Sequence, residues 1–288
     1  MSSLIIKDLN FSYGQKKVLK DINLEIGNGL FGLLGRNGAG KSTLMKLIVG
    51  LIPPVSGRIE VCGQTSVKEI RKKIGYLPQD FDFYPDMKVK ESLFYLGTLD
   101  NITKKALKER VEILLELVNL KQESNVKIKT LSGGMKRRLG IAQSLLNDPE
   151  VLIVDEPTSG LDPEERIRFR NLLSDISKEK IVLFSTHIAS DLESAAHGLG
   201  ILENGNFIYH GTVDDLLNRY SFGTYETYIT DNEYSDFKKK HIIFEQKEQR
   251  GGMQIRFIHL GKPQPDFMRI APTLESAYLM CIHDRRQA

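Results

Sequence analysis

The chain lacks the residues on which several classes of protein depend. It has no tryptophan, and its only cysteines are Cys62 and Cys281 among 288 residues. These two cysteines lie far apart and match no metal-ligand spacing, so we expect free thiols of a cytosolic protein. No apolar run reaches the roughly 20 residues that cross a bilayer, and the first residues have no signal-peptide layout. We therefore expect a cytoplasmic protein that meets a membrane only through a partner chain.

An excess of charge of one sign is also missing. Forty lysines and arginines face 37 aspartates and glutamates, which leaves a formal net charge of only +3. A dedicated nucleic-acid-binding protein usually concentrates far more positive charge, so the composition argues against a nucleic-acid partner. The length suits one large domain or two modest ones, with enough chain to bury a core.

The stretch from Gly35 to Thr43 matches G-x-x-x-x-G-K-[ST], the pattern of a phosphate-binding loop. The apolar run at 30–34 predicts a buried strand before it, and 44–49 predicts the first turns of a helix after it. Glycines let successive N–H groups face one anion, and the helix N-terminus adds positive charge. A glycine-rich turn that binds nothing is the alternative. The predicted phosphate-binding residues are Gly35, Arg36, Asn37, Gly38, Ala39, Gly40, Lys41, Ser42 and Thr43, with Lys41 on the β- and γ-phosphates and Ser42 on Mg²⁺.

Two carboxylates follow the apolar run at 151–154. Four apolar residues in a row are typical of a strand buried on both faces of a parallel sheet. Asp155 and Glu156 at its end would be costly without a cation or a catalytic task. We expect Asp155 to hold Mg²⁺ with its water, and Glu156 to act as general base toward the attacking water. A pair of solvated acids at a strand end is the alternative.

Two polar side chains emerge at the ends of other predicted strands. Gln79 follows the strand predicted from Lys73, at the edge where open α/β sheets bind ligands. His187 follows the buried run at 180–186 and would contact a phosphate. An ordinary loop glutamine, and a histidine that caps or packs, are the alternatives.

An aromatic side chain lies upstream of the phosphate loop. We predict strands at 4–9 and 18–26 with a turn-rich link over 10–16 between them. Tyr13, in this link, would stack on a purine ring, whereas Phe11 suits the core better.

Two loops lead into predicted helices. Leu131, Ser132, Gly133, Gly134 and Met135 open one helix, and a serine with two glycines there makes an anion site, although capping alone also explains it. The other loop is Ser159, Gly160, Leu161 and Asp162. Asp162 precedes a proline and two acids, so N-capping is a sufficient account of it, though not an exclusive one.

The pattern of apolar residues predicts two domains. We expect an α/β domain over 1–218 and a small α+β domain over 219–288. Helical spacing over 89–119 indicates a helical insertion, which we place at about 85–147. Asn204-Gly205 between two short apolar runs predicts a hairpin. The tail pattern predicts three strands and a closing helix, at 225–230, 242–246, 253–259 and 273–282.

In chain order these motifs resemble those of the nucleotide-binding subunit of an ATP-binding-cassette (ABC) transporter, over roughly residues 4–215. The matching segments are Tyr13 for the adenine-stacking aromatic, 35–43 for Walker A, Gln79 for the Q-loop, 131–135 for the signature motif, 151–156 for Walker B with its catalytic glutamate, 159–162 for the D-loop and His187 for the switch histidine. Met135 departs from the glutamine that the family commonly has there.

The resemblance implies an α/β P-loop NTPase cassette with a mixed sheet core, an antiparallel β subdomain and a helical subdomain, followed by the small C-terminal α+β domain. It implies ATP and Mg²⁺ as cofactors, with Ser42, Gln79 and Asp155 on the metal. The catalytic residues that it implies are Glu156, His187 and Gln79.

The resemblance also implies partners. In the family, two cassettes hold two ATP molecules, each between one chain's Walker A loop and residues of the other that correspond to 132–134. The second cassette is identical or different, and separate transmembrane permease subunits hold the pair at the cytoplasmic face. The loop after Gln79 would couple hydrolysis to the permease. The tail helix at 273–279 looks like that of exporters of drugs, antibiotics or polysaccharides.

Another class of function stays open, a soluble ATPase of the same superfamily that acts on ribosomes or DNA. Translation-factor members usually carry two cassettes and repair members a long coiled coil, and this chain has neither. A GTPase is disfavoured because the chain has no N-K-x-D motif. We expect an ATPase subunit that powers a transporter, and more specifically an exporter.

Overall fold

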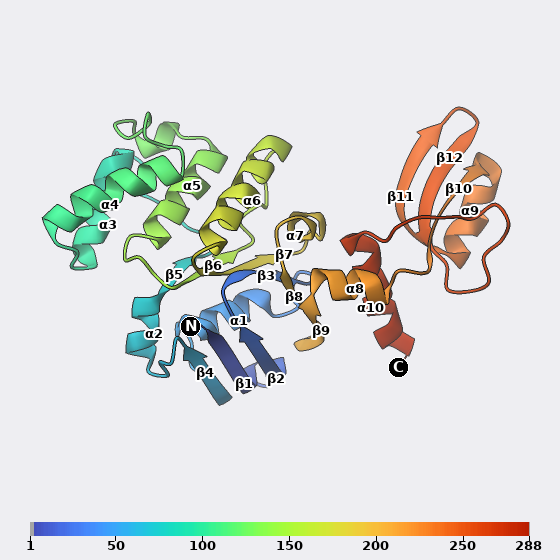
Figure 1. Ribbon diagram of the computed structural model, residues 1–288, viewed down its shortest axis with the longest axis horizontal. Coiled ribbons are helices and arrows are strands. Elements are labelled where there is room, and N and C mark those ends of the chain that lie inside the picture. The colour runs from blue at the N-terminus through green and yellow to red at the C-terminus, as the bar shows by residue number, and fades with distance from the viewer. Residues whose placement is uncertain (1–2, 288) are drawn as a thin grey trace. The chain divides into compact units, whose positions relative to one another are not determined.

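The computed structural model of the chain, drawn in Figure 1, describes residues 3–287. It consists of two compact units. The first comprises Met1–His187 with Ala195–His210, and the second comprises Ile188–Ser194 with Gly211–Ala288.

An antiparallel sheet begins the first unit. Its strands are β1 (Leu4–Tyr13), β2 (Lys16–Ile26) and β4 (Ser56–Val61), in the order β2-β1-β4. Both predicted N-terminal strands are confirmed, but the turn-rich link predicted over 10–16 is wrong. The strands pair as far as Tyr13 and Lys16, because Gly14 adopts a φ of 57° and closes a two-residue turn. Tyr13 therefore lies at the tip of a hairpin.

The larger sheet has the strand order β5-β6-β7-β3-β8-β9. Strands β5, β6, β7, β3 and β8 are parallel, and every residue of β6 and β7 is buried, as their apolar runs predict. The predicted Asn204-Gly205 hairpin turn joins β8 to β9, with φ angles of 49° and 80°. The bounds are β3 Gly29–Leu34, β5 Ile74–Leu77, β6 Val151–Asp155, β7 Ile181–Thr186, β8 Gly198–Glu203 and β9 Asn206–Thr212.

The core of the first unit lies between these two sheets. Helix α1 (Lys41–Ile48) contacts β2 on one side and β6 on the other. It buries Leu44, Met45 and Ile48 in the cluster that the inward side chains of β1, β2 and β3 complete. Because α1 begins where the phosphate loop ends, this packing fixes the position of the loop.

Three helices form a layer of their own, at the upper left of Figure 1. They are α3 (Val89–Leu99), α4 (Lys104–Leu117) and α5 (Gly133–Ser144), with a short 3₁₀ turn at Ile128–Thr130. Helices lie where the apolar spacing over 89–119 predicts them, but they are interrupted between α3 and α4. Asn101 has a φ of 61°, a left-handed conformation that ends a helix.

Two more helices complete the first unit. Helix α6 (Pro163–Ser177) begins as predicted, because the Asp162 carboxylate accepts a hydrogen bond from the Glu165 N–H at 2.9 Å. The sequence does not predict α2 (Val67–Lys73), in which Ile70 is the only buried residue.

The second unit is an α+β structure. Its sheet has the order β11-β12-β10-β13, and helix α9 packs on it around Phe237 and Phe257. The three strands predicted in the tail are confirmed, whereas α9 as a whole and the two-residue β13 are not predicted. Helix α10 contacts α7 and α8. The bounds are α7 Ser190–Glu193, α8 Val213–Arg219, β10 Thr224–Thr230, α9 Asp231–Lys240, β11 Ile242–Gln249, β12 Gly252–Ile258, β13 Met268–Arg269 and α10 Leu274–Gln287.

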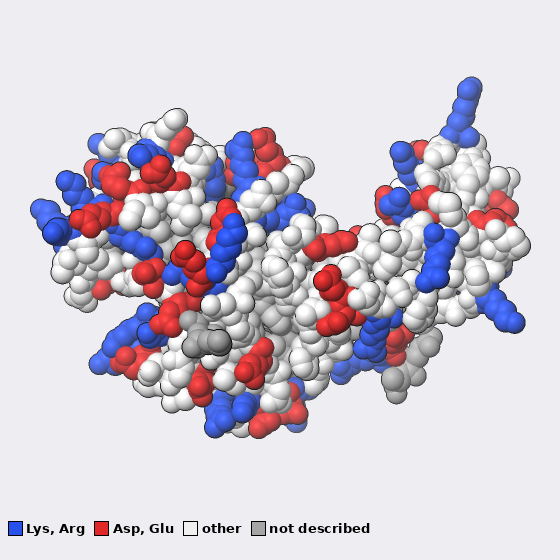
Figure 2. All heavy atoms as spheres, in the orientation of Figure 1, with Lys and Arg blue, Asp and Glu red and all other residues white. Residues whose placement is uncertain are grey.

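Charged side chains of both signs share the surface. On the face drawn in Figure 2, lysines and arginines alternate with aspartates and glutamates over the layer of α3, α4 and α5. Within this layer an ion pair between Lys90 and Glu112 joins α3 to α4. Between residues 3 and 287, no helix is long and apolar enough to cross a membrane.

Candidate functional site

The polar segments after β3, β6 and β7 meet at one edge of the larger sheet. These strands are neighbours in the order β6-β7-β3, so their carboxyl ends lie side by side. Backbone hydrogen bonds hold the three segments together. The Gly35 N–H donates to Thr186 O at 3.3 Å, and the Glu156 N–H donates to Ser185 O at 3.2 Å. The phosphate loop, Glu156 and His187 are thus brought together as the sequence predicts.

The phosphate loop requires glycine at two positions for different reasons. A Cβ atom on Gly35 would lie 2.4 Å from the backbone oxygen of Leu202, so no larger residue fits against β8. Gly40 has a φ of 112°, a conformation that L side chains rarely adopt. It stands directly before α1, whose N-terminal N–H groups and dipole favour an anion.

Lys41, the first residue of α1, is buried among oxygen atoms. Its ammonium donates to Gly35 O at 2.7 Å and lies 2.9 Å from Glu156 Oε1. Both side chains are about 5–6% exposed, so each charge depends on the other. An anion that binds the loop would compete with Glu156 for this ammonium.

Glu156 contacts a second polar side chain, that of His187, through its other oxygen. Glu156 Oε2 lies 2.6 Å from His187 Nδ1, and the His187 side chain is 38% exposed. Lys41, Glu156 and His187 therefore form a continuous chain of polar contacts across three neighbouring strand ends. The carboxylate between them is oriented from both sides.

Ser185 on β7 links the two carboxylates and is a residue that the sequence does not single out. Its fully buried hydroxyl donates to Asp155 Oδ1 at 2.6 Å and accepts from the Glu156 N–H at 3.0 Å. Glu156 has a φ of 47°, which non-glycine residues seldom adopt, so these hydrogen bonds help to hold a strained backbone. Tyr76 lies on β5, which pairs with β6 on its other side. Burial raises the pKa of Tyr76, and the negative charge of Asp155 raises it further.

A cavity of about 650 Å³ lies over these strand ends. Predicted residues from separate parts of the chain line it, among them Tyr13, Gln79 and Glu156. Basic residues of β2, which the sequence does not single out, join them. Within residues 3–287 the cavity is lined by Tyr13, Lys16, Lys17, Val18, Lys20, Arg36, Asn37, Gly38, Gly40, Lys41, Ser42, Thr43, Gln79, Glu156, Asn204 and Gly205.

The charge of this cavity suits a polyphosphate. Five of the lining residues are lysine or arginine, and Glu156 is the one carboxylate among those that the structure describes. Tyr13, 51% exposed at the hairpin tip, adds an aromatic ring that meets Phe11 edge to face at 4.8 Å between ring centroids. An anionic chain with a flat ring at one end fits this arrangement.

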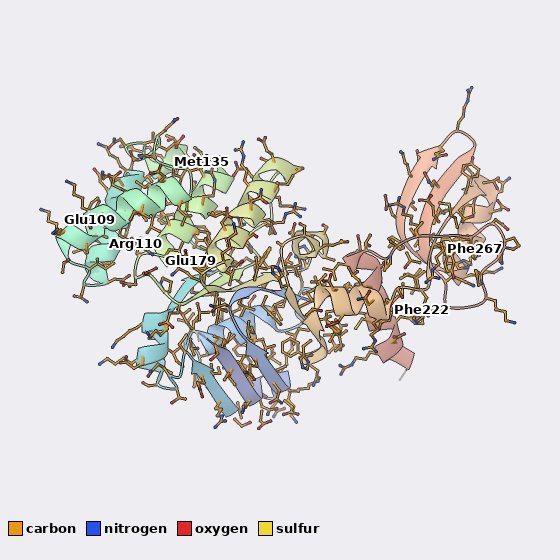
Figure 3. The ribbon with its side chains drawn as sticks, viewed as in Figure 1. Glu109, Arg110, Met135, Glu179, Phe222 and Phe267 are labelled. Atoms are coloured by element: carbon orange, nitrogen blue, oxygen red, sulfur yellow. The ribbon has the colours of Figure 1, made fainter. Side chains whose placement is uncertain are left out.

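Two predicted motifs are placed elsewhere in the first unit. Residues 131–135 lie at the start of α5 in the helical layer, where Figure 3 labels Met135. Ser132 caps that helix by accepting from the Met135 N–H at 3.2 Å. Neither this segment nor 159–162 contributes to the described lining of the cavity.

A glycine-rich loop between a parallel strand and a helix, with a carboxylate-bearing strand two places along the same sheet, is typical of a P-loop nucleoside triphosphatase. The family model described as "ABC transporter" matches residues 19–159. A protein of Bacillus subtilis named ABC transporter ATP-binding protein YxlF is 32% identical, over 97% of this chain and 99% of its own length. The chain belongs to the ABC transporter family of ATP-binding proteins, whose members bind ATP and hydrolyse it to power transport.

Other relatives carry more specific names. The linearmycin resistance ATP-binding protein LnrL of Bacillus subtilis is 38% identical, over 74% of this chain and 70% of its own. The Nod factor export ATP-binding protein I of Cupriavidus pinatubonensis is 36% identical, over 75% of this chain and 68% of its own. These names do not favour the alternative of a soluble ATPase that acts on ribosomes or DNA.

Solved structures share the cassette fold. One described as the ATP binding subunit of an ABC transporter superposes with a TM-score of 0.67 and 29% identity, covering 75% of this chain and 92% of that one. CbiO1 from Clostridium perfringens, part of an ABC transporter complex, gives a TM-score of 0.68 and 27% identity, covering 75% and 95%. The mixed sheet, the antiparallel sheet and the helical layer are therefore those of an ABC cassette.

Proposed function

We propose that this chain hydrolyses Mg-ATP for an exporter, with Glu156 as general base and Lys41 as the phosphate-binding cation. The observation that carries the proposal is the contact chain from Lys41 through Glu156 to His187, at 2.9 and 2.6 Å, beside a cavity rich in basic residues. Tyr13 stacks on the adenine ring, and the loop residues Gly35 to Thr43 bind the phosphates.

Substrate binding changes the partner of Lys41. The terminal phosphate oxygens take over the ammonium that Glu156 Oε1 contacts, because both are anions competing for one cation. That exchange leaves Glu156 Oε1 able to accept a proton from the attacking water. His187 stays on the other carboxylate oxygen and fixes its direction.

The residues near the strand ends also fit a magnesium ion. The hydroxyl of Ser42, the amide oxygen of Gln79 and the carboxylate of Asp155 are hard oxygen donors of the kind that Mg²⁺ prefers. Among the described residues there is no cluster of three or more His, Cys, Asp or Glu side chains that would hold a metal alone. An ion held there would neutralise charge on the phosphates. Asp155, oriented by Ser185, would hold its water shell.

Partners and domain roles follow from the same proposal. Residues 1–218 act as the nucleotide-binding domain, with the helical subdomain at about 85–147, and residues 219–288 act as an accessory domain. Residues 131–135 and the D-loop at 159–162 contact the ATP of a second cassette, which is consistent with their lying outside the chain's own cavity. Transmembrane permease subunits hold the pair at the cytoplasmic face of the membrane. The export direction rests on the names of the linearmycin resistance and Nod factor export relatives.

Glu156→Gln tests the catalytic assignment. Glutamine keeps the length of the side chain but is no base at neutral pH, so turnover should fall by roughly 10²–10⁴-fold. Nucleotide should bind at least as tightly, because Lys41 no longer has a competing anion. The variant should accumulate as an ATP-bound pair of cassettes. Phosphate release and size-exclusion chromatography with Mg-ATP measure both effects.

The matched control is Glu150→Gln, a substitution of a surface carboxylate that pairs with Lys73 away from the cavity. It should leave turnover unchanged. Wild-type turnover in Glu156→Gln would remove the general-base role. Co-purification of the chain with a multi-spanning protein from detergent-solubilised membranes tests the predicted permease partner. Recovery of the chain with ribosomes instead would favour the alternative of a soluble ATPase.

A further inference from the structure

Arg137, one turn into α5, makes contacts that the nucleotide site itself does not require. Its guanidinium Nη2 donates to Ser159 O at 2.8 Å, and Nη1 donates to Glu156 O at 3.3 Å. Both acceptors are backbone oxygens of the turn that follows β6. One side chain of the helical layer therefore holds the peptide of Glu156, whose carboxylate lies between Lys41 and His187.

The turn that Arg137 holds is tight and conformationally unusual. Glu156 and Gly160 both have positive φ angles, and the Ser159 N–H also bonds to Glu156 O, at 3.3 Å. A guanidinium offers two donors in one rigid plane, so it fixes the spacing of two carbonyls better than a lysine can. A small rotation of α5 would be transmitted directly to the Glu156 peptide.

Arg137 also connects three of the sequence motifs. It is the fifth residue of the helix that Ser132 caps, and its acceptors are Glu156 and the first residue of the 159–162 loop. The carboxylate of Asp80, next to Gln79, is close enough to interact with the guanidinium electrostatically. Burial lowers the pKa of Arg137 and the charge of Asp80 opposes that effect, but the side chain remains a cation.

We propose that Arg137 is a positioning residue that transmits contact at Ser132–Gly134 on the start of α5 to the general base Glu156 of the same chain. The inference rests on the proposed function, in which a second cassette's ATP lies against that helix start. When the contact moves α5, the guanidinium moves the turn after β6 and brings the Glu156 carboxylate into line. Hydrolysis in a chain's own cavity then depends on the nucleotide held at the start of its α5.

Arg137→Ala in the full-length chain should separate chemistry from binding. Arg137 does not line the described cavity, so the affinity for a fluorescent ATP analogue should stay within about twofold. A misplaced catalytic group can cost on the order of 100-fold, so kcat should fall about 10–100-fold while KM changes little. Arg137→Lys should recover part of the rate, because one carbonyl can still be bound. Lys136→Ala, which removes the neighbouring cation of α5, should behave as wild type.

A double-mutant cycle with Ser132→Ala tests transmission itself. If Arg137 carries the effect of the Ser132 contact, the double variant should lose much less activity than the product of the two single losses. Strictly additive losses, or unchanged kcat in Arg137→Ala, would overturn the proposal. So would equal losses in kcat and analogue affinity, which a merely structural link between α5 and the turn would produce. Should Arg137→Ala not fold, judged by circular dichroism and Tm, the same cycle is run with Arg137→Lys.

Glu156→Gln, run in parallel, separates this inference from the proposed function. A slow Glu156→Gln together with a wild-type Arg137→Ala contradicts only the role of Arg137. A fast Glu156→Gln contradicts the general base, and with it the residue that Arg137 is inferred to position.

Discussion

Lys41 and Glu156 show how strongly two single residues depend on each other. Each is buried, and removing one partner of a buried ion pair leaves an uncompensated charge that costs about 3–5 kcal/mol. His187 offsets part of that cost on Glu156, since it contacts the other carboxylate oxygen. The pair therefore affects both the stability of the first unit and its binding of nucleotide.

Lys41→Ala should lose nucleotide binding and stability together. Loss of a charge-assisted contact of about 1.5–3 kcal/mol weakens ATP binding by roughly 10–100-fold, and turnover should nearly vanish. The variant Lys41→Met, Glu156→Gln should recover the Tm without recovering turnover. Titration with a fluorescent ATP analogue, thermal unfolding and phosphate release measure the three effects. Near-wild-type ATPase activity in Lys41→Ala would disprove the assignment of the loop.

Ser185→Ala should slow catalysis without emptying the cavity. Asp155 loses the donor at 2.6 Å, whereas the Glu156 N–H keeps the backbone oxygen of residue 185. Loss of a buried hydrogen bond costs about 1–3 kcal/mol of stability. We expect kcat to fall about tenfold with higher Mg²⁺ needed for half activation, because Asp155 is less well oriented. Ser185→Thr keeps the hydroxyl and is the control; equal losses in both variants would contradict the role of the hydroxyl.

Single residues are predictable from sequence when the motif that contains them is continuous. Glu156 and His187 each lie just after a buried run, and Lys41 closes the glycine loop that begins where such a run ends, so their place near strand ends could be derived. The role of Ser185 could not be predicted, because the sequence shows it only as a residue of a buried strand. Its contact with Asp155 follows from the pairing of β6 with β7. Lys16 and Lys17 resemble any solvated lysines, and their place at the cavity depends on the hairpin turn at Gly14.

At the scale of elements, the β8–β9 hairpin connects the phosphate loop to the antiparallel sheet. The Gly205 N–H donates to Ala39 O at 3.2 Å, and the Lys20 N–H donates to Gly205 O at 2.8 Å. Gly205 has a φ of 80°, and a Cβ there would lie 2.2 Å from Val18 O. This approach is possible only for glycine.

Gly205→Ala should therefore disturb the phosphate loop, although a glycine contributes no side chain to the chemistry of the site. The unfavourable φ alone costs about 1–3 kcal/mol, and the backbone clash adds to that cost. We expect a lower Tm and weaker binding of ATP. Gly251→Ala is the matched control, because it has a φ of 89° but its Cβ would meet only Tyr228 Oη at 3.6 Å. Equal effects of the two substitutions on ATP affinity would contradict the coupling of hairpin and loop.

Elements with a long apolar pattern were the predictable ones. The buried runs of β6 and β7 and the stripe of α4 were recognisable because their burial repeats along the chain. Helix α2 buries Ile70 alone, and β13 consists of two residues that pair with β10. Such elements depend on neighbours distant in sequence, so a local pattern does not contain them.

At the scale of the whole molecule, every residue of the described part of the chain that lines the cavity lies between Tyr13 and Gly205. A chain that ends at residue 220 keeps all of them but lacks α10, which contacts α7 and α8. We expect this chain to have a lower Tm and to retain ATP binding. Full-length Lys41→Ala, which should bind poorly, is the comparison. A folded truncated chain that binds no nucleotide would show that the cassette is not independent.

The family of the whole molecule was predictable from the order of its motifs rather than from the pattern of buried residues. Seven short motifs in one order identify the cassette, although no single one does, and the fold follows from membership of the family. The tail carries no such motif. Its strands were derived from the alternation of apolar residues. Its role could not be derived, because no residue of the site lies in the tail.

The second unit is discontinuous, since it takes Ile188–Ser194 from the middle of the chain and the rest from Gly211 onward. Helix α7 in the first segment contacts α10, which begins at Leu274. A ribosome adds about 5–20 residues per second, so α7 emerges several seconds before its packing partner. The peptide directly after His187 therefore spends that time without its native neighbour. Helix α10, made about 80 residues after α7, thus completes the packing of a segment that begins one residue beyond His187.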